Sequence, residues 1–178
     1  INDKKFISLV FDVSKTFAIN DFLISIFKDY NPIGMVNCSF PRGKGWKRDP
    51  HDITSEEMND CVNVHLNSYN LFTYYFANIC SKKNIESSIV NIASIFGVIA
   101  PPVHLYNWED SYPSIPYPAI KGGIIAFTRY SAAKYGKNNI RINCISPGGI
   151  FDNQPEPFLD AYKAFTNGEG MLDVNDII

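Results

Sequence analysis

A tyrosine and a lysine four residues apart, Tyr117 and Lys121, carry the most informative chemistry in this sequence. On a helix this spacing places the two side chains about 40° apart around the axis, so both can face one cleft. A phenol has a pKa near 10, and a neighbouring ammonium favours the phenolate and lowers that pKa. Ser94, at the end of a strand-like run, could hold the oxygen that exchanges the proton. Together the three side chains suit interconversion of a carbonyl and an alcohol with a hydride cofactor.

The same spacing occurs on many solvent-exposed helices, so its meaning depends on the elements that position it. Four short apolar runs rich in β-branched residues predict strands that are buried on both faces of a parallel sheet. These runs are residues 6–12, 33–39, 88–94 and 140–146. Helices are predicted over residues 16–28, over 54–81 from a capping-box start, and over 117–135 before a terminating Gly136.

Alternating strands and helices predict one α/β domain over residues 1–178, with a Rossmann-like, doubly wound parallel sheet. Ligands bind such sheets beyond the carboxyl ends of the strands. Polar or glycine residues follow all four predicted strands, at Asp12, Asn37, Ser94 and the turn at Pro147 and Gly148. Their convergence at one edge of the sheet predicts a site there.

Composition excludes several other classes of protein. An apolar content of 46% with 19% charged residues is typical of a globular domain, and a net charge of −2 gives no general attraction to nucleic acid or anionic lipid. No apolar run reaches membrane-spanning length, and the histidines and cysteines show no metal-ligand spacing. The four cysteines are interpreted as small buried residues in a reducing compartment. We therefore expect a cytoplasmic protein without a metal site.

One loop is locally basic. Its residues are Arg42, Gly43, Lys44, Gly45, Trp46, Lys47 and Arg48. The loop is either a solvated surface segment or a contact for a phosphorylated ligand, and the sequence leaves both interpretations open.

In these motifs the sequence resembles the short-chain dehydrogenase/reductase family over nearly its whole length. Ser94, on Asn91-Ile-Ala-Ser94, and the Tyr117-x-x-x-Lys121 pair match the family's catalytic residues. The resemblance implies that Tyr117 is the general acid and base and that Ser94 positions the substrate oxygen. It also implies that Lys121 lowers the pKa of the tyrosine and orients the nicotinamide ribose.

The resemblance further implies a cofactor, NAD or NADP, without deciding between them. The implied cofactor-binding residues are Asp12, Val13, Asn37, Tyr117, Lys121, Pro147, Gly148 and Ile150. In the family, the first two positions contact the adenine and the third lies beside the adenosine ribose. The main chain of the Pro-Gly turn holds the nicotinamide amide.

Two single residues depart from the family pattern. His65 stands where the family has a fourth catalytic residue, an asparagine whose main-chain carbonyl holds a water in a proton relay. A histidine there could keep the carbonyl role, add a titratable group, or be a satisfied core residue, and Asn67 is the neighbouring alternative. Asp152 replaces a threonine that often contacts the cofactor, so that contact is not expected.

The segment between Ser94 and Tyr117 is longer than in the family. Its Tyr106 and Trp108 could stack on a sugar ring, or the segment could be a proline-stiffened surface loop that packs its own aromatic residues. Together with residues 147–157, it resembles the branch that serves flagellin modification and nonulosonic-acid biosynthesis. That resemblance implies a sugar or amino-sugar precursor as substrate.

The family's first strand, glycine-rich turn and final strand have no counterpart in this sequence. We therefore expect a fragment that holds the third to sixth strands of the fold and that alone neither binds dinucleotide tightly nor turns over. The full-length protein is expected to be a homo-oligomer. Two other functions stay open: a catalytically silent partner subunit or nucleotide sensor, and an extended-type sugar-nucleotide dehydratase or epimerase with tightly held NAD.

Overall fold

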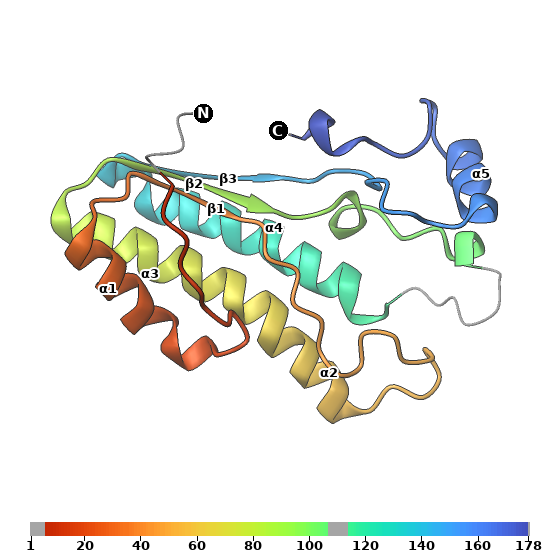
Figure 1. Cartoon of the computed structure of the whole chain (residues 1–178), viewed down its shortest axis with the longest axis horizontal. Helices are drawn as coiled ribbons and strands as arrows, with labels where there is room; N and C mark the ends of the chain where they lie inside the picture. Colours follow the sequence, from red (N-terminus) through yellow and green to blue (C-terminus); the bar gives the residue numbers. More distant parts are fainter. Residues whose placement is uncertain (1–5, 107–113, 178) are drawn as a thin grey trace.

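A computed structural model describes residues 6–106 and 114–177, and its sheet is formed by three parallel strands. In sheet order they are β1 (Gly34–Asn37), β2 (Ser87–Ile92) and β3 (Ile140–Ile145). Met35 pairs with Ile89, and Ile89 pairs with Ile142, so apolar side chains lie in register across the sheet. Figure 1 shows the long helices α1, α3 and α4 running along one side of this sheet. The α/β class and the parallel sheet are confirmed.

The first predicted strand, residues 6–12, is wrong. The segment has no regular secondary structure, and Phe6 and Val10 are 85% and 98% exposed. A strand is stabilised only when its backbone groups pair with a neighbour, and no strand of the described residues pairs with this one. One side chain still holds the segment to the helices: the Phe11 ring stacks on Phe22 at 4.1 Å and meets Phe72 edge-on at 5.8 Å.

Helix α1 (Ile19–Asp29) follows a single 3-10 turn (Thr16–Ala18) within the predicted range. Its buried residues Ile19, Leu23 and Phe27 recur every four residues, which is the spacing of one helical face. The Phe27 ring packs on Phe76 of the next long helix, with 5.2 Å between centroids. This contact belongs to the main hydrophobic core, between α1, α3 and the sheet.

The helix predicted over residues 54–81 is divided into three parts. They are α2 (Ser55–Cys61), a π-helix (Val62–Asn67) and α3 (Ser68–Lys83). The capping box is confirmed, because the Thr54 hydroxyl accepts from the Glu57 amide at 3.2 Å and the Glu57 carboxylate accepts from the Thr54 amide at 3.0 Å. The π-helix contains His65, which is completely buried.

Helix α4 (Pro116–Tyr135) begins with a proline in its first turn, where a missing N–H is tolerated. Gly136 follows its last residue as predicted, but with φ −55° it is right-handed and leads into a 3-10 turn (Gly136–Asn138). The chain reverses at Asn139, whose φ is 58°. The reversal therefore depends on an asparagine, which tolerates the left-handed region.

The remaining elements are α5 (Glu156–Phe165) and three 3-10 turns, Ile95–Gly97, Val103–Tyr106 and Val174–Asp176. In Figure 1, α5 and the chain after β3 lie beyond the carboxyl ends of β2 and β3. None of the described helices has both the length and the apolar character needed to cross a membrane.

A buried polar network joins α3, β2 and α4 through the core. The Thr73 hydroxyl donates to Asn91 Oδ1 at 3.0 Å, and Asn91 Nδ2 donates to the Thr128 hydroxyl at 3.0 Å. Because buried polar groups are costly when unpaired, this chain of hydrogen bonds specifies how the two helices sit on the strand. It fixes the relative position of the end of β2 and the start of α4.

All four cysteines are free thiols. Cys61 and Cys80 are buried, as predicted. Cys38 is exposed and Cys144 is partly buried, so the prediction of a buried position is wrong for Cys38.

Candidate active site

A cleft of about 990 Å³ lies where β2 and β3 end and α4 begins. Seven of the predicted site residues line it: Ser94, Tyr106, Tyr117, Lys121, Pro147, Gly148 and Ile150. Hydrogen bonds hold the two strand ends together at its base, from the Ala93 amide to the Ile145 carbonyl at 2.8 Å and from the Ile95 amide to the Pro147 carbonyl at 2.9 Å.

Ser94 lies just beyond β2, at the start of the 3-10 turn Ile95–Gly97. Its hydroxyl oxygen accepts from the Phe96 amide at 3.2 Å, which orients the side chain, and only 5% of the residue is exposed. Its side chain also lies close enough to Tyr117 to lower the pKa of the phenol. Residues from two separate elements therefore meet at the phenol.

Burial raises the pKa of Tyr117 above its usual value, and the nearby Ser94 side chain partly opposes that effect. The spacing alone predicted a lower pKa, caused by Lys121. That prediction is wrong in this structure, because the lysine ammonium donates to the Ile92 carbonyl at 2.9 Å and lies 5.8 Å from the centre of the tyrosine ring. Loss of solvent around the phenol has the larger effect.

Lys121 is 2% exposed and sits among aromatic rings. Its Nζ lies 5.4 Å from the ring centre of Tyr69 and 5.6 Å from that of Phe40. Ring faces and a carbonyl favour the ammonium, whereas burial favours the neutral amine and lowers the pKa of Lys121 to about 8. At pH 7 the charged form still predominates by roughly ten to one.

His65 lies beneath the cleft, enclosed by the rings of Phe40, Trp46 and Tyr69 at 5.2–5.7 Å. Both ring nitrogens lack a hydrogen-bond partner among the described residues. Burial, helped by the charge of Lys121, lowers the pKa of His65 to about 3, so the imidazole is neutral at physiological pH. It is therefore neither a satisfied core histidine nor a group that titrates near neutrality.

The main-chain carbonyl of His65 accepts from the Ser68 hydroxyl at 2.8 Å. Asn67, the alternative candidate, donates its side-chain amide to Asn63 at 3.2 Å, on the exposed side of the helix. Neither candidate lines the cleft, but His65 packs against Phe40 and Trp46, which do.

The predicted cofactor residues separate into two groups. Asp12 and Asn37 do not line the cleft. Asp12 accepts from the Ser14 hydroxyl at 2.7 Å, and this hydrogen bond lowers its pKa; Val13 packs against the main core. Asn37 is buried and donates to the Tyr69 carbonyl at 3.3 Å.

The Pro-Gly turn does belong to the cleft, and Tyr162 of α5 supports it. The phenol oxygen of Tyr162 accepts from the Gly149 amide at 2.6 Å, and a Cβ at Gly149 would lie 2.9 Å from that ring. The turn, Tyr117 and Lys121 together present main-chain groups, a phenol and an ammonium to one space. These groups fit the nicotinamide and ribose half of a dinucleotide.

Of the two predicted substrate residues, Tyr106 lines the cleft and Trp108 lies outside the described residues. The Tyr106 ring contacts Phe158 of α5 at 5.9 Å, and burial raises its pKa. Leu105, Phe158 and Tyr162 form a small hydrophobic cluster that joins this segment to α5. Tyr106 therefore packs within the wall of the cleft.

Further residues of the cleft escaped the sequence analysis as site residues. They are Phe40, which precedes the basic loop; Arg42, Trp46 and Lys47 of that loop, whose contact with a ligand the sequence left open; and Phe158 and Tyr162 from α5. In the loop, the alternation of cations, glycines and Trp46 indicates a possible ligand contact, because it combines positive charge with an aromatic ring. No local signal marks the α5 residues, which reach the cleft only through tertiary packing.

Comparison with known proteins gives concordant results. A family model described as enoyl-(acyl carrier protein) reductase matches residues 2–167. The chain is 34% identical to post-translational flagellin modification protein A of Campylobacter coli over 176 residues, which are 98% of this chain and 68% of that protein. It is 28% identical to glucose 1-dehydrogenase 2 of Bacillus subtilis, covering 84% of this chain and 54% of that protein.

Among solved structures, a short-chain dehydrogenase of Leptospira borgpetersenii with bound NAD+ is similar to this chain, with a TM-score of 0.82 and 31% identity. The similarity covers 95% of this chain and 64% of that one. This chain thus spans between about half and about two thirds of the length of these relatives.

Proposed function

We propose that this chain, which belongs to the short-chain dehydrogenase/reductase family, carries the active site of an NAD(P)-dependent oxidoreductase that interconverts a carbonyl and an alcohol on a sugar or amino-sugar precursor. The observation that carries the proposal is the convergence of Ser94, Tyr117 and Lys121 on one cleft. The sugar assignment is supported by similarity to a flagellin modification protein and to a glucose dehydrogenase.

Tyr117 is the proton donor and acceptor of this reaction. Because burial raises its pKa, the phenol is protonated at neutral pH, which is the form that donates to a carbonyl oxygen during reduction. The Ser94 hydroxyl lines the same cleft beside this phenol and so can hold the same substrate oxygen. A bound dinucleotide supplies or accepts the hydride.

Lys121 has two roles in the proposal. One N–H of its ammonium donates to the Ile92 carbonyl at 2.9 Å, which leaves further donors for ribose hydroxyls. Its ammonium also lies 5.8 Å from the centre of the Tyr117 ring, a cation–π contact that helps to hold the phenol in the cleft. The main chain at Pro147, Gly148 and Ile150, which lines the same cleft, would hold the nicotinamide amide.

Replacing Tyr117 with Phe tests the proposal in the protein expressed from its complete gene. Removing the hydroxyl should lower kcat by about 10²–10⁴-fold, the usual contribution of general acid catalysis, with little change in NAD(P) affinity. Tyr130→Phe is the matched control, because Tyr130 lies on the same helix but is 59% exposed and does not line the cleft. Tyr117→Phe enzyme that keeps full turnover would refute the assignment.

The homo-oligomeric state expected from the resemblance belongs to the same proposal, and analytical ultracentrifugation measures it directly.

The behaviour of the cofactor distinguishes the proposed reaction from that of a dehydratase or epimerase. Exchangeable NAD(P) consumed in stoichiometric amounts supports the dehydrogenase, whereas NAD that stays bound through purification supports the alternative. Protein that neither consumes exchangeable NAD(P) nor retains bound NAD would support the third alternative, a catalytically silent partner subunit.

A further inference from the structure

We propose that Arg42 and Lys47 form an anion-binding edge of the active-site cleft, so that the substrate carries a phosphate or a carboxylate. Both residues line the cleft that contains Ser94 and Tyr117. The inference rests on the proposed function, because it names the chemical class of that site's substrate.

The loop that carries the two cations is fixed against α2. A Cβ at Gly43 would lie 2.6 Å from Cys61 Cα, and one at Gly45 would lie 2.7 Å from Glu57 Cβ, so the backbone of the loop lies directly on the helix. The Lys44 amide donates to Asp60 Oδ2 at 2.8 Å. These contacts set which side of the loop faces the helix and which faces the cleft.

Because the loop is held against α2, two of its four basic residues line the cleft and two do not. Arg48 forms an ion pair with Glu57 of α2, and Lys44 does not line the cleft. Arg42 and Lys47 are exposed and make no ion pair with a carboxylate in residues 6–106 or 114–177. Only these two therefore present an uncompensated positive charge to the cleft from this loop.

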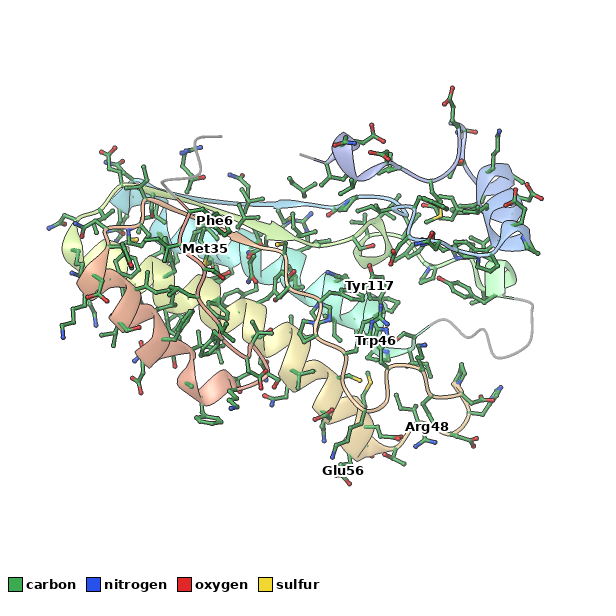
Figure 2. All side chains as sticks on the ribbon, in the orientation of Figure 1. Phe6, Met35, Trp46, Arg48, Glu56 and Tyr117 are labelled. Atoms are coloured by element: carbon green, nitrogen blue, oxygen red, sulfur yellow. The ribbon has the colours of Figure 1, made fainter. Side chains whose placement is uncertain are left out.

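Aromatic rings connect the two cations to the reacting centre. The Arg42 guanidinium lies over Phe40, 5.3 Å from its ring centre, and the Phe40 ring lies 6.2 Å from that of Tyr117. Trp46, which precedes Lys47, is 5.7 Å from the Tyr117 ring, and Figure 2 shows it between Tyr117 and Arg48. The bound anion would thus lie on a part of the substrate away from the reacting carbon.

The charge of the cleft supports an anionic ligand. Within residues 6–106 and 114–177, the charged residues that line it are Arg42, Lys47, Lys121 and Asp152. Among the described lining residues three cations face one acid, so this part of the cleft is positive although the chain carries a net charge of −2. Asp152, which follows the Pro-Gly turn, can accept hydrogen bonds from the hydroxyl or amino groups of a sugar.

Two sources could supply the anion: the substrate and the phosphates of the dinucleotide. Lys47 is next to Trp46, which contacts Tyr117, and both cations share the cleft with Ser94. These are the residues that would meet the substrate, whereas Asp12 and Asn37, implied for the adenosine half, lie outside this cleft. We therefore assign the anion to the substrate.

The experiment compares four probes by calorimetry at low ionic strength: glucose 6-phosphate, glucose, inorganic phosphate and NADH. The protein is expressed from its complete gene as wild type, as the double variant Arg42→Gln/Lys47→Gln, and as Lys44→Gln. The last variant removes one charge from the same loop outside the cleft. The substituted side chains are exposed, so folding should be preserved.

The wild type should bind glucose 6-phosphate more tightly than glucose, and the double variant should lose about tenfold in affinity for the sugar phosphate, or about 1.4 kcal/mol. Lys44→Gln should bind like the wild type, and NADH affinity should be the same in all three proteins. Equal sugar-phosphate affinity in the wild type and the double variant would overturn the inference. A double variant that loses affinity only for NADH would also overturn it. The same holds if the wild type binds neither inorganic phosphate nor the sugar phosphate.

Adding Tyr117→Phe to the same series separates this inference from the proposed function. That variant keeps both cations, so it should bind the sugar phosphate as the wild type does while it loses turnover. Protein that binds the anion through Arg42 and Lys47 but never turns over would refute the oxidoreductase alone. Turnover without any preference for an anionic substrate would refute the anion-binding edge alone.

Discussion

The buried imidazole of His65 should make the folded protein sensitive to mild acid. A histidine in the unfolded chain titrates near pH 6.5, whereas burial lowers the pKa of His65 to about 3. Below pH 6.5 the unfolded state therefore binds a proton that the folded state does not, and stability falls as the pH falls. From these two values, lowering the pH from 7 to 5 removes about 2 kcal/mol of unfolding free energy.

The charged and titratable groups around this imidazole do not change the sign. Lys121 carries a like charge that further disfavours the imidazolium, and the phenols of Tyr69 and Tyr117 have raised pKa values and stay neutral in this range. Glu57 has a pKa lowered to about 2 by Arg48, so its protonation affects stability mainly at lower pH. Among these groups, His65 is therefore the one whose titration changes the free energy of unfolding between pH 7 and pH 5.

Urea unfolding at pH 7 and pH 5 measures this effect. His65→Phe and His65→Asn both remove the titration, so each should lose about 2 kcal/mol less than the wild type between the two pH values. Whatever either substitution does to packing shifts stability equally at both pH values and cancels in this difference. His51→Gln, at an exposed histidine, should behave as the wild type does. Identical losses in the wild type and both His65 variants would show that the imidazole is not buried and neutral.

Two further substitutions test the environment of the cleft. Burial lowers the pKa of Lys121 from 10.5 to about 8, so at this site the unfolded state binds more protons between these values. Lys121 alone should therefore add about 2 kcal/mol to the free energy of unfolding from pH 8 to pH 10, measured as the difference between the wild type and Lys121→Met. Lys121→Met should lack this rise in denaturant unfolding, and an unchanged rise would contradict the burial of the ammonium. Gly97→Ala should destabilise the protein by about 1–3 kcal/mol, because its Cβ would lie 2.6 Å from the backbone of Lys121. Gly136→Ala, with open space and a right-handed φ of −55°, is its control and should leave the melting temperature unchanged or higher.

Local patterns in the sequence determined the elements that carry the catalytic candidates. Strands β2 and β3 lie within runs rich in β-branched apolar residues, although β3 alternates between buried and exposed residues and is not covered on both faces. The capping box at Thr54 has a fixed spacing, and α4 begins at a proline. Each of these signals depends on residues a few positions apart, so it can be read without knowing the fold. The convergence of Ser94 with Tyr117 followed from the rule that ligands meet the carboxyl ends of parallel strands.

Tertiary structure alone decided the properties that depend on distant neighbours. Residues 6–12 have the composition of a strand, but a strand needs a partner, and none of the described strands pairs with them. The spacing of Tyr117 and Lys121 predicted a lowered phenol pKa, whereas the surrounding rings and α5 exclude water and raise it. Which cations of the basic loop face the cleft was likewise decided by α2, where Glu57 neutralises Arg48 and leaves Arg42 free. Pairing, burial and charge compensation all arise from contacts between segments far apart in the chain, and local sequence patterns do not encode them directly.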